Sequence, residues 1–315
     1  MIFDSLEKKL DQVERLAKAS KMQRLLHNPW RYAWSQFFRT VIFPFTKKGV
    51  IRKAQTFTGH PLSILLPSGL DIYLTGGKTH DSEIRLARFF LNHYKALSNQ
   101  QSETSPSFID IGAHVGYFSL VVAAVLEGKA RIFTFEAAKG TFDVLEKNLK
   151  PFSNIKTFHN AVTDVETDLT FFEFPVSHSE FNTLHNKQFE NEAWYKKFKP
   201  EKIIVKGITL DSIVQKFDLK NPLIKIDTEG AEAQVIKGGL ETFKHQSPIV
   251  IMEFLTKNNE GHKEAYNILI SLNYQAHTIN QDGTLKPLVD IEAYFKTCDL
   301  DSDNFVFVKK HFKVS

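Results

Sequence analysis

The sequence has a single cysteine, Cys298, among its 315 residues. One thiol can form neither an internal disulfide nor a cysteine-based zinc site, so we expect a reducing compartment. No run approaches the roughly 18 consecutive apolar residues that a membrane-spanning helix requires. The N-terminus also lacks a basic head followed by an apolar run, so we expect no secretory signal. Together these absences predict a cytoplasmic protein.

A strong charge of one sign is also missing. The chain carries 40 Lys and Arg against 36 Asp and Glu, which gives a formal net charge of +4. This excess is too small to indicate a nucleic-acid-binding protein, and we expect no nucleic-acid partner. With 42% hydrophobic residues, the chain can bury a full-sized core and still carry an appendage.

The first 54 residues differ in composition from the rest. Residues 4–26 predict an amphipathic helix, and residues 28–53 interleave aromatic with basic side chains. This mixture suits a segment on an inner membrane surface or a docking face, but the same aromatics would equally cover the core of a larger domain. Residues 55–75 contain Gly and Pro clusters that predict hairpins. We therefore expect an N-terminal extension, 1–54, and a main domain, 55–315.

From residue 108 onward, apolar strands alternate with helices. Strands are expected at 108–111, 131–136, 155–159, 223–227, 249–253, 274–279 and 305–308, with helices at 117–126, 141–149 and 232–243. This alternation predicts an α/β fold with a doubly wound, mostly parallel, Rossmann-like sheet. An insertion at about 169–208 is polar and aromatic, which is typical of a lid or substrate loop.

The turn after the first of these strands carries the sharpest signal. The strand ends in Asp110, and the chain turns through Gly112 and Gly116 into a helix. Glycines let a ligand approach the backbone, and ligands bind at the carboxyl ends of strands in such sheets. The spacing differs from the dinucleotide fingerprint, and a carboxylate here would repel a diphosphate. The turn therefore favours a ligand that carries ammonium and sulfonium groups, as S-adenosylmethionine does.

Glu136 ends the next strand, where it could accept hydrogen bonds from both hydroxyls of a ribose. Dinucleotide-binding folds use an acid in the same way, so Glu136 alone does not discriminate between the two ligands.

A further group of acids follows strand 223–227. Asp227, Glu229 and Glu232 surround a glycine there, and Glu253 closes the next strand and should point into the same crevice. Carboxylates crowded at a strand end repel one another, so they indicate a metal, a cationic ligand or a base with a raised pKa. Lys225, within the strand, could neutralise one of these acids or extend along the surface.

These blocks resemble the FkbM-type methyltransferase family over about residues 80–255. The matching segments are Asp110-Ile-Gly-Ala-His-Val-Gly116, Glu136-Ala, Asn160-Ala-Val, Thr209-Leu-Asp and Lys225-Ile-Asp-Thr-Glu-Gly-Ala-Glu232. The resemblance implies a class I methyltransferase fold with a seven-stranded sheet and S-adenosylmethionine as cofactor. It also implies O-methylation of a sugar, a glycan, a glycolipid or a related polar metabolite, as in polysaccharide biosynthesis.

The resemblance further implies roles for individual residues. Asp110, Gly112 and Gly116 would hold the methionine part of the cofactor, Glu136 the ribose, and Asn160, Ala161 and Asp164 the adenine. Asp227, Glu229 and Glu232 would face the acceptor. His114 stands where the family more commonly has asparagine, and we expect it to stabilise the turn. If it contacts the cofactor instead, the site would be pH-sensitive.

Methylation of a hydroxyl requires help in removing its proton, from a base or from a metal. Asp227 or Glu229 is the leading candidate for the base, with His178 and His185 of the insertion as a second choice. Glu253 and His178 are also expected near the acceptor. Mg²⁺ suits oxygen-rich clusters, but the sequence does not show enough fixed ligands to predict it.

Two other functions compete with this one. An NAD(P)-dependent oxidoreductase or epimerase would use the same sheet, but it requires a third glycine, and Phe118 stands near where that glycine is sought. A membrane-surface scaffold built around residues 28–53 leaves the acidic strand ends unexplained. The oligomeric state is not predicted.

Overall fold

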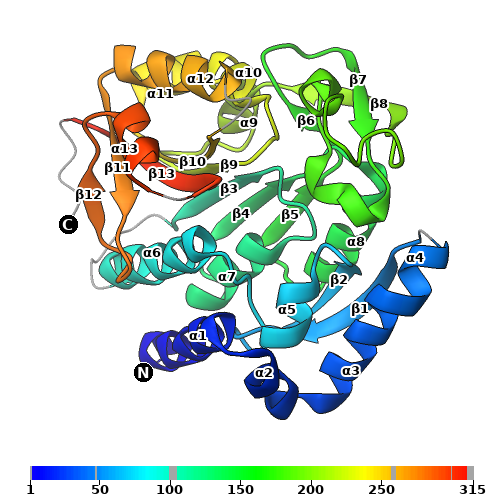
Figure 1. The fold of residues 1–315 in the computed structure, drawn as a ribbon. Helices are drawn as coiled ribbons and strands as arrows, with labels where there is room; N and C mark the ends of the chain where they lie inside the picture. The colour runs from blue at the N-terminus through cyan, green and yellow to red at the C-terminus, as the bar shows by residue number, and fades with distance from the viewer. Residues whose placement is uncertain (1, 47, 99–104, 257–259, 299, 311–315) are drawn as a thin grey trace.

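A computed structural model describes residues 2–46, 48–98, 105–256, 260–298 and 300–310. Within these residues, the central sheet has eight strands in the order β12-β11-β13-β10-β9-β3-β4-β5 (Figure 1). They span β3 Ser107–Ile111, β4 Arg131–Phe135, β5 Ile155–Phe158, β9 Leu223–Ile226, β10 Ile249–Leu255, β11 Tyr274–Ile279, β12 Leu285–Pro287 and β13 Ser302–Lys309. The doubly wound, mostly parallel sheet is confirmed.

The strand order reverses next to β3. Strands β4 and β5 lie on one side of β3, and β9 and β10 lie on the other, all parallel. The carboxyl ends of β3 and β9 therefore flank a topological switch point, where such sheets form a crevice. The register sets Asp110 of β3 beside Lys225 of β9.

Each face of the sheet is covered by its own helices. Side chains alternate along the strands, so that Phe108 and Ile132 join one hydrophobic core, and Ile109 and Phe133 join the other. The first core contains α1 Ile2–Lys18, α6 Asp81–Ser98, α7 Tyr117–Val125 and α8 Lys139–Leu149. The second contains α9 Leu210–Lys216, α10 Glu232–Lys237, α11 Leu240–His245, α12 Glu260–Ser271 and α13 Ile291–Thr297.

The insertion forms a small sheet of its own beside β5. Its strands are β6 Ala161–Val162, β8 Glu201–Ile208 and β7 Asp168–Glu173, in that order. Two short 3₁₀ helices, η2 Val176–Phe181 and η3 Asn186–Phe189, follow β7. Figure 1 shows this unit next to the edge of the central sheet that ends in β5.

The N-terminal extension is a chain of helices and a hairpin. Its elements after α1 are α2 Lys21–His27, α3 Pro29–Phe37, the π-helix η1 Phe38–Ile42, α4 Phe43–Thr46, β1 Val50–Gln55, β2 Pro61–Leu66 and α5 Leu70–Thr75. The single helix expected over 4–26 is wrong, because Ser20 forms a capping box with Gln23 that starts a second helix.

Two further expectations are corrected. Only one hairpin forms near residues 55–75, between β1 and β2, and the chain that follows it is the helix α5. The sheet has eight described strands instead of seven, because Gly283, with a φ of 80°, turns the chain so that β12 pairs back onto β11. Residue 54, where the N-terminal extension is predicted to end, lies within β1, which pairs with β2; the division into two domains stays a prediction.

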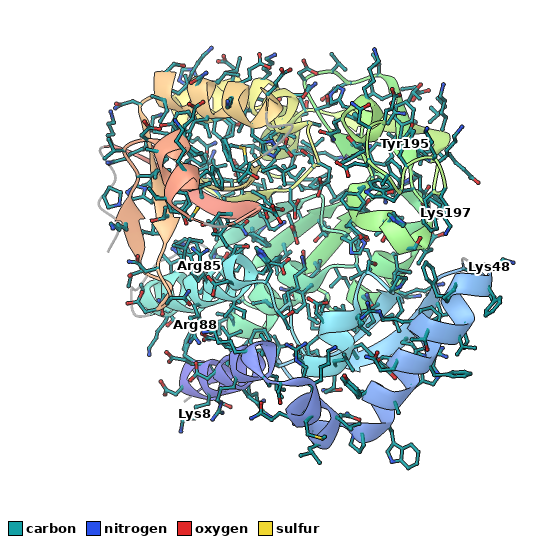
Figure 2. The ribbon with its side chains drawn as sticks, in the orientation of Figure 1. Lys8, Lys48, Arg85, Arg88, Tyr195 and Lys197 are labelled. Carbon is teal, nitrogen blue, oxygen red and sulfur yellow. The ribbon has the colours of Figure 1, made fainter. Side chains whose placement is uncertain are left out.

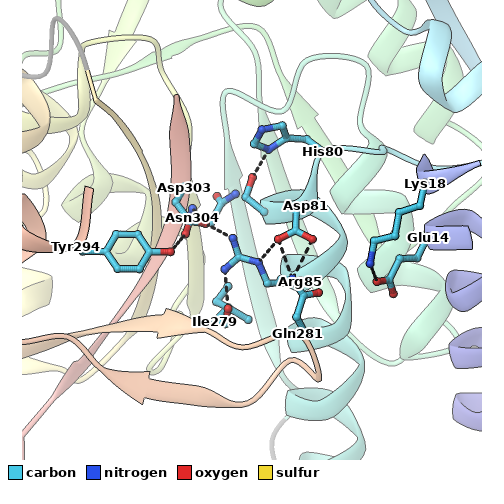
Figure 3. Close-up of polar contacts among 11 residues, drawn as sticks. Glu14, Lys18, His80, Asp81, Arg85, Ile279, Gln281, Tyr294, Asp303 and Asn304 are labelled. Atoms are coloured by element: carbon cyan, nitrogen blue, oxygen red, sulfur yellow. Dashed lines mark hydrogen bonds and ion pairs between the residues drawn. The ribbon is translucent and has the colours of Figure 1, made fainter. Parts of the chain in front are cut away.

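Two arginines of α6 tie it to distant parts of the chain. Arg88 contacts Asp11 and Glu14 of α1 at 2.8 and 2.5 Å, and Figure 2 shows it at the side of α6 that faces α1. Arg85 is buried and lies 2.9 Å from the buried Asp303 of β13, as Figure 3 shows. These contacts hold the N-terminal helix and the antiparallel end of the sheet against the same helix.

Candidate active site

A cavity of about 370 Å³ opens at the switch point between β3 and β9. Its walls come from the carboxyl ends of β3, β4, β9 and β10, from η2 of the insertion, and from residues 65–83. A volume of this size is in the range of small-molecule sites. The candidate residues that line it are Asp110, Gly112, His114, Glu136, Asn160, Ala161, Asp227, Glu229 and Glu253.

Packing requires glycine in the turn after β3. A Cβ on Gly112 would lie 1.7 Å from the carbonyl oxygen of Asp227. With any other residue at position 112, the loop after β3 could not approach the loop after β9 this closely. Gly112 and Gly116 also have φ angles of 73° and 88°, which favour glycine. Gly116 packs against Leu149 and does not line the cavity.

Asp110 is fully buried at the base of the cavity. Its Oδ2 accepts a hydrogen bond from Ser119 Oγ at 2.7 Å, whereas its Oδ1 has no partner among the described residues. Burial raises the pKa of Asp110 above its ordinary value, against the opposing effect of the Lys225 ammonium. A buried carboxylate oxygen without a donor fits a site that receives a donor from a ligand.

Glu136 connects the end of β4 to the glycine turn. Its two oxygens accept hydrogen bonds from the backbone N–H groups of His114 and Ala138, both at 2.9 Å. Burial raises the pKa of Glu136 to about 7. These two bonds fix the carboxylate at the cavity wall and leave further lone pairs for hydroxyl donors.

His114 lies within the glycine turn and lines the cavity, and its role in stabilising the turn stays a prediction. Its φ of 53° lies in the left-handed region, which His and Asn adopt more readily than most residues. Its Nε2 lies 2.9 Å from Ser179 Oγ of the insertion. Burial and the nearby Lys78 ammonium lower the pKa of His114 to about 4, so the ring is neutral at ordinary pH.

Three carboxylates converge opposite the glycine turn. Asp227, Glu229 and Glu253 each place an oxygen within 4.8 Å of the others. Although burial opposes it, the ammonium groups of Lys225 and Lys78 hold the pKa of Asp227 below its ordinary value.

The other two carboxyl groups of this cluster shift in the opposite direction. Burial and Asp227 raise the pKa of Glu253 to about 8, and burial with the neighbouring carboxylates raises the pKa of Glu229 well above its ordinary value. Crowding thus separates one ionised acid from two that hold a proton more tightly.

Five candidate residues do not line the cavity. One is Gly116, described above, and a second is Asp164, which is exposed and accepts from Thr163 Oγ1. A third is His185 of the insertion, whose Nε2 lies 2.7 Å from Gln234 Nε2. Glu232 is buried, accepts from Thr228 and Gly230, and lies 3.4 Å from His262, so it shapes the acidic loop from behind. His178 packs in an aromatic cluster of the insertion, with its ring 4.2 Å from that of Phe198.

Sequence reasoning missed one wall of the cavity. Asp71, Lys78 and Glu83 line it from the segment before the central sheet, and Lys78 forms an ion pair with Glu83. Ser179 and Glu180 line it from η2. The Gly76-Gly77 turn was the only local signal for this wall, and it does not reveal which side chains the turn would bring to the cavity.

The cavity is strongly acidic. Eight carboxyl groups line it against two lysines, Lys78 and Lys225. The acids are Asp71, Glu83, Asp110, Glu136, Glu180, Asp227, Glu229 and Glu253. Such a cavity attracts cationic and hydroxyl-rich ligands and repels phosphates and carboxylates.

A comparison with protein families identifies the class of this site. The profile described as "Methyltransferase FkbM domain" matches residues 110–276, which is more than half of the chain. The matched range begins at Asp110 and includes the acidic loop. The chain belongs to the FkbM methyltransferase family, and the protein is a methyltransferase. This assignment sets aside the oxidoreductase alternative.

Solved structures and curated sequences add little to this assignment. A precorrin-6y C5,15-methyltransferase from Geobacter metallireducens is 13% identical, covers 72% of this chain and 87% of its own, and has a TM-score of 0.36. A putative O-methyltransferase from Klebsiella pneumoniae is 12% identical, covers 74% and 84%, and has a TM-score of 0.38. The comparison with curated protein sequences gave no match.

Proposed function

We propose that this protein transfers the methyl group of S-adenosylmethionine to a hydroxyl oxygen of a polar acceptor, such as a sugar, a glycan or a glycolipid. The observation that carries the proposal is the acidic cavity at the switch point, which Asp110 lines with an Oδ1 that accepts no hydrogen bond from any residue the structure describes. A cofactor with ammonium and sulfonium charges complements these carboxylates, whereas the diphosphate of NAD would be repelled.

The residues of the glycine turn have positions suited to the cofactor. Asp110 Oδ1 would accept from an ammonium group, and Glu136, fixed by two backbone bonds, would accept from ribose hydroxyls. Asn160 and Ala161 also line the cavity, and we assign the adenine to them. Gly116 and Asp164 would act only through the shape of the backbone, because neither lines the cavity.

When bound, S-adenosylmethionine would supply an electrophilic methyl carbon; the S–C bond would break with its electron pair left on sulfur as the acceptor oxygen bonds to that carbon. The chain must align the hydroxyl and take its proton. We assign the proton to the ionised form of Glu229, because a carboxylate with a raised pKa is a stronger base than Asp227, whose pKa is lowered. Asp227, paired with Lys225 at 2.7 Å, would orient the acceptor.

The position of Glu229 is set by the insertion. Its φ is 51°, and its carbonyl oxygen accepts from Thr183 Oγ1 at 2.8 Å and from Gln188 Nε2 at 2.5 Å. The insertion therefore contacts the loop of the proposed base and also lines the cavity through Ser179 and Glu180, which supports a role as a substrate loop. Lys225 and Lys78 already supply positive charge beside the carboxylates, so the proposed mechanism does not require Mg²⁺.

The charge of the cavity also restricts the acceptor. A neutral polyol or an amino-bearing acceptor is favoured, and an acceptor with a phosphate or carboxylate at the reacting end is disfavoured. Incubation with methyl-labelled S-adenosylmethionine and a panel of neutral, amino and uronic sugars tests this. Labelling of the uronic sugars alone would contradict the proposed charge selectivity.

The cofactor is tested by thermal unfolding with S-adenosylhomocysteine and, in parallel, with NAD. A ligand at 100 times its dissociation constant adds about 2.7 kcal/mol, which raises Tm by roughly 5 °C for a chain of this size. The shift should appear with S-adenosylhomocysteine alone and be lost in Glu136→Ala. Glu173→Ala is the matched control, because Glu173 lies nearby but does not line the cavity. A shift with NAD alone would contradict the proposal.

A further inference from the structure

The N-terminal segment concentrates the positive charge of the protein. No Asp or Glu occurs between Glu14 and Asp71, although the whole chain is nearly balanced. The exposed cations of this stretch include Lys21, Arg39, Lys48, Arg52 and Lys53. Figure 2 shows Lys48 at the outer end of α4, pointing away from the body of the molecule. The segment therefore presents a basic surface, because it contains no acidic residue of its own to offset these cations.

The same segment exposes large apolar side chains. Of the eleven large hydrophobic residues that are exposed in the described part of the chain, seven lie between residues 22 and 51. They are Met22, Leu26, Trp30, Phe37, Val41, Phe45 and Ile51. Trp30 and Phe45 are each 85% exposed. A group of this kind on a monomer usually marks an interaction surface.

The helical run from α3 to α4 has two apolar faces. Trp30, Phe37, Val41 and Phe45 recur at intervals of seven and four residues, which places them along one exposed side. The other side packs on the protein core through Phe38, which is only 1% exposed. The sequence left two roles open for the aromatics of residues 28–53: covering the core, or forming a membrane-surface or docking face. Some of them cover the core and others face solvent.

We propose that the α2–α4 surface, formed by Met22, Leu26, Trp30, Phe37, Val41, Phe45 and the exposed cations around them, binds an anionic membrane surface. An interfacial helix inserts aromatic and aliphatic side chains at the headgroup level, and flanking Lys and Arg are attracted to anionic lipids. Contact is with the surface only, since none of the described helices combines the length and apolar composition that spanning a bilayer requires.

Helix α5 links this surface to the cavity. On one side, Arg31 Nη1 of α3 donates to the carbonyl oxygen of Tyr73 at 3.1 Å, and the Trp34 ring meets the Tyr73 ring edge-on at 6.1 Å. Asp71 and Ile72 of the same helix line the cavity. Figure 1 shows α5 between α3 and the central sheet. Binding through α3 would therefore hold one wall of the cavity close to the lipid surface.

Co-sedimentation of the full chain with vesicles tests the proposal without any enzymatic assay. The protein should bind phosphatidylcholine vesicles that contain about one third phosphatidylglycerol more tightly than pure phosphatidylcholine, with affinity falling as salt rises. Trp30→Ser with Phe45→Ser should weaken binding at least about tenfold, because both lost side chains are apolar anchors. Arg39→Glu with Lys48→Glu should weaken it by at least about tenfold through charge.

The matched control replaces exposed apolar residues elsewhere. Ile204→Ser with Val289→Ser removes two such side chains outside the α2–α4 surface and should leave vesicle binding unchanged. All variants should keep their Tm and their shift with S-adenosylhomocysteine, which separates this proposal from that of the cofactor. The proposal is overturned if wild type fails to bind anionic vesicles, or if both double variants bind as wild type does. It is also overturned if the substitutions abolish binding of an RNA oligomer or self-association while vesicle binding persists.

Discussion

The ammonium group of Lys225 lies 2.7 Å from Oδ2 of Asp227, and the side chain of Lys225 is only 4% exposed. Across the sheet, Lys225 is in register with Asp110. One buried cation thus lies between two acids of the cavity, one from each side of the switch point. Of the two roles considered for Lys225 from the sequence, the structure confirms neutralisation.

Replacing Lys225 by methionine should therefore show how far the stability of the fold depends on this buried cation. Lys225→Met leaves buried carboxylates without their cation, and we expect the free energy of unfolding to fall by about 3 kcal/mol. The loss should be larger at pH 8 than at pH 5, because the pKa values of Asp227 and Asp110 would rise and ionisation would then cost stability. Urea denaturation at both pH values measures this. Lys220→Met, at an exposed lysine, is the control, and an equal loss in both variants would refute the argument.

Replacing Asp110 should weaken the binding of the cofactor and leave the stability of the fold almost unchanged. Within the described part of the chain its buried Oδ1 has no hydrogen-bond partner, and burial raises its pKa, so Asp110→Asn should change the free energy of unfolding by no more than about 1 kcal/mol. The same change should reduce the affinity for S-adenosylhomocysteine at least about tenfold, since a charge-assisted hydrogen bond is lost. Calorimetric titration measures the affinity. Unchanged affinity would remove Asp110 from the cofactor site.

Glu253 should make stability fall as pH rises. Burial and Asp227 raise its pKa to about 8 from an ordinary value of 4.5. Between these values the folded protein holds a proton that the unfolded chain has lost, so its stabilising effect is complete below pH 4.5 and is lost as pH rises through 8. Glu253→Gln cannot ionise, so its free energy of unfolding should gain about 4 kcal/mol on that of wild type between pH 5 and 8.5. The exposed Glu146→Gln is the control, and parallel pH profiles for all three proteins would contradict the prediction.

His114 should affect stability only on the acid side. Its pKa is lowered to about 4 by burial and Lys78, from an ordinary 6.5, so the unfolded chain binds a proton first as pH falls. Wild type should therefore lose stability between pH 6.5 and 4 that His114→Asn retains, because asparagine also adopts the left-handed φ and does not titrate. Thermal melts across this range measure it. His114→Val should instead be destabilised at every pH, by about 1–2 kcal/mol.

Much of the fold was predictable because its signals are local. The alternation of apolar strands with helices, and strand ends such as Asp110 and Glu136, follow from periodicities within ten or twenty residues. The eighth strand was missed because β12 has only three residues and depends on pairing with β11. The break at Ser20 was missed because the apolar period continues on both sides of it.

The cavity was only partly predictable for a related reason. Asp227 and Glu229 were identified because they follow a strand within the motif, whereas Asp71, Lys78 and Glu83 come from a segment with no motif. Glu232 belongs to the same motif but turns behind the loop, where it accepts hydrogen bonds from Thr228 and Gly230. Spacing along the chain indicates which acids are near a strand end, but not which way each side chain points.

The sequence by itself determined the class of this protein, because the glycine turn, the strand-end acids and their order along the chain are properties of short segments. Only the tertiary structure decided which charges share the cavity and which aromatics of the N-terminal segment reach solvent. Lys78 pairs with Glu83 beside Asp227, and Phe38 is buried while Trp30 is exposed. Both outcomes depend on contacts between residues far apart in the chain, which burial and packing select together.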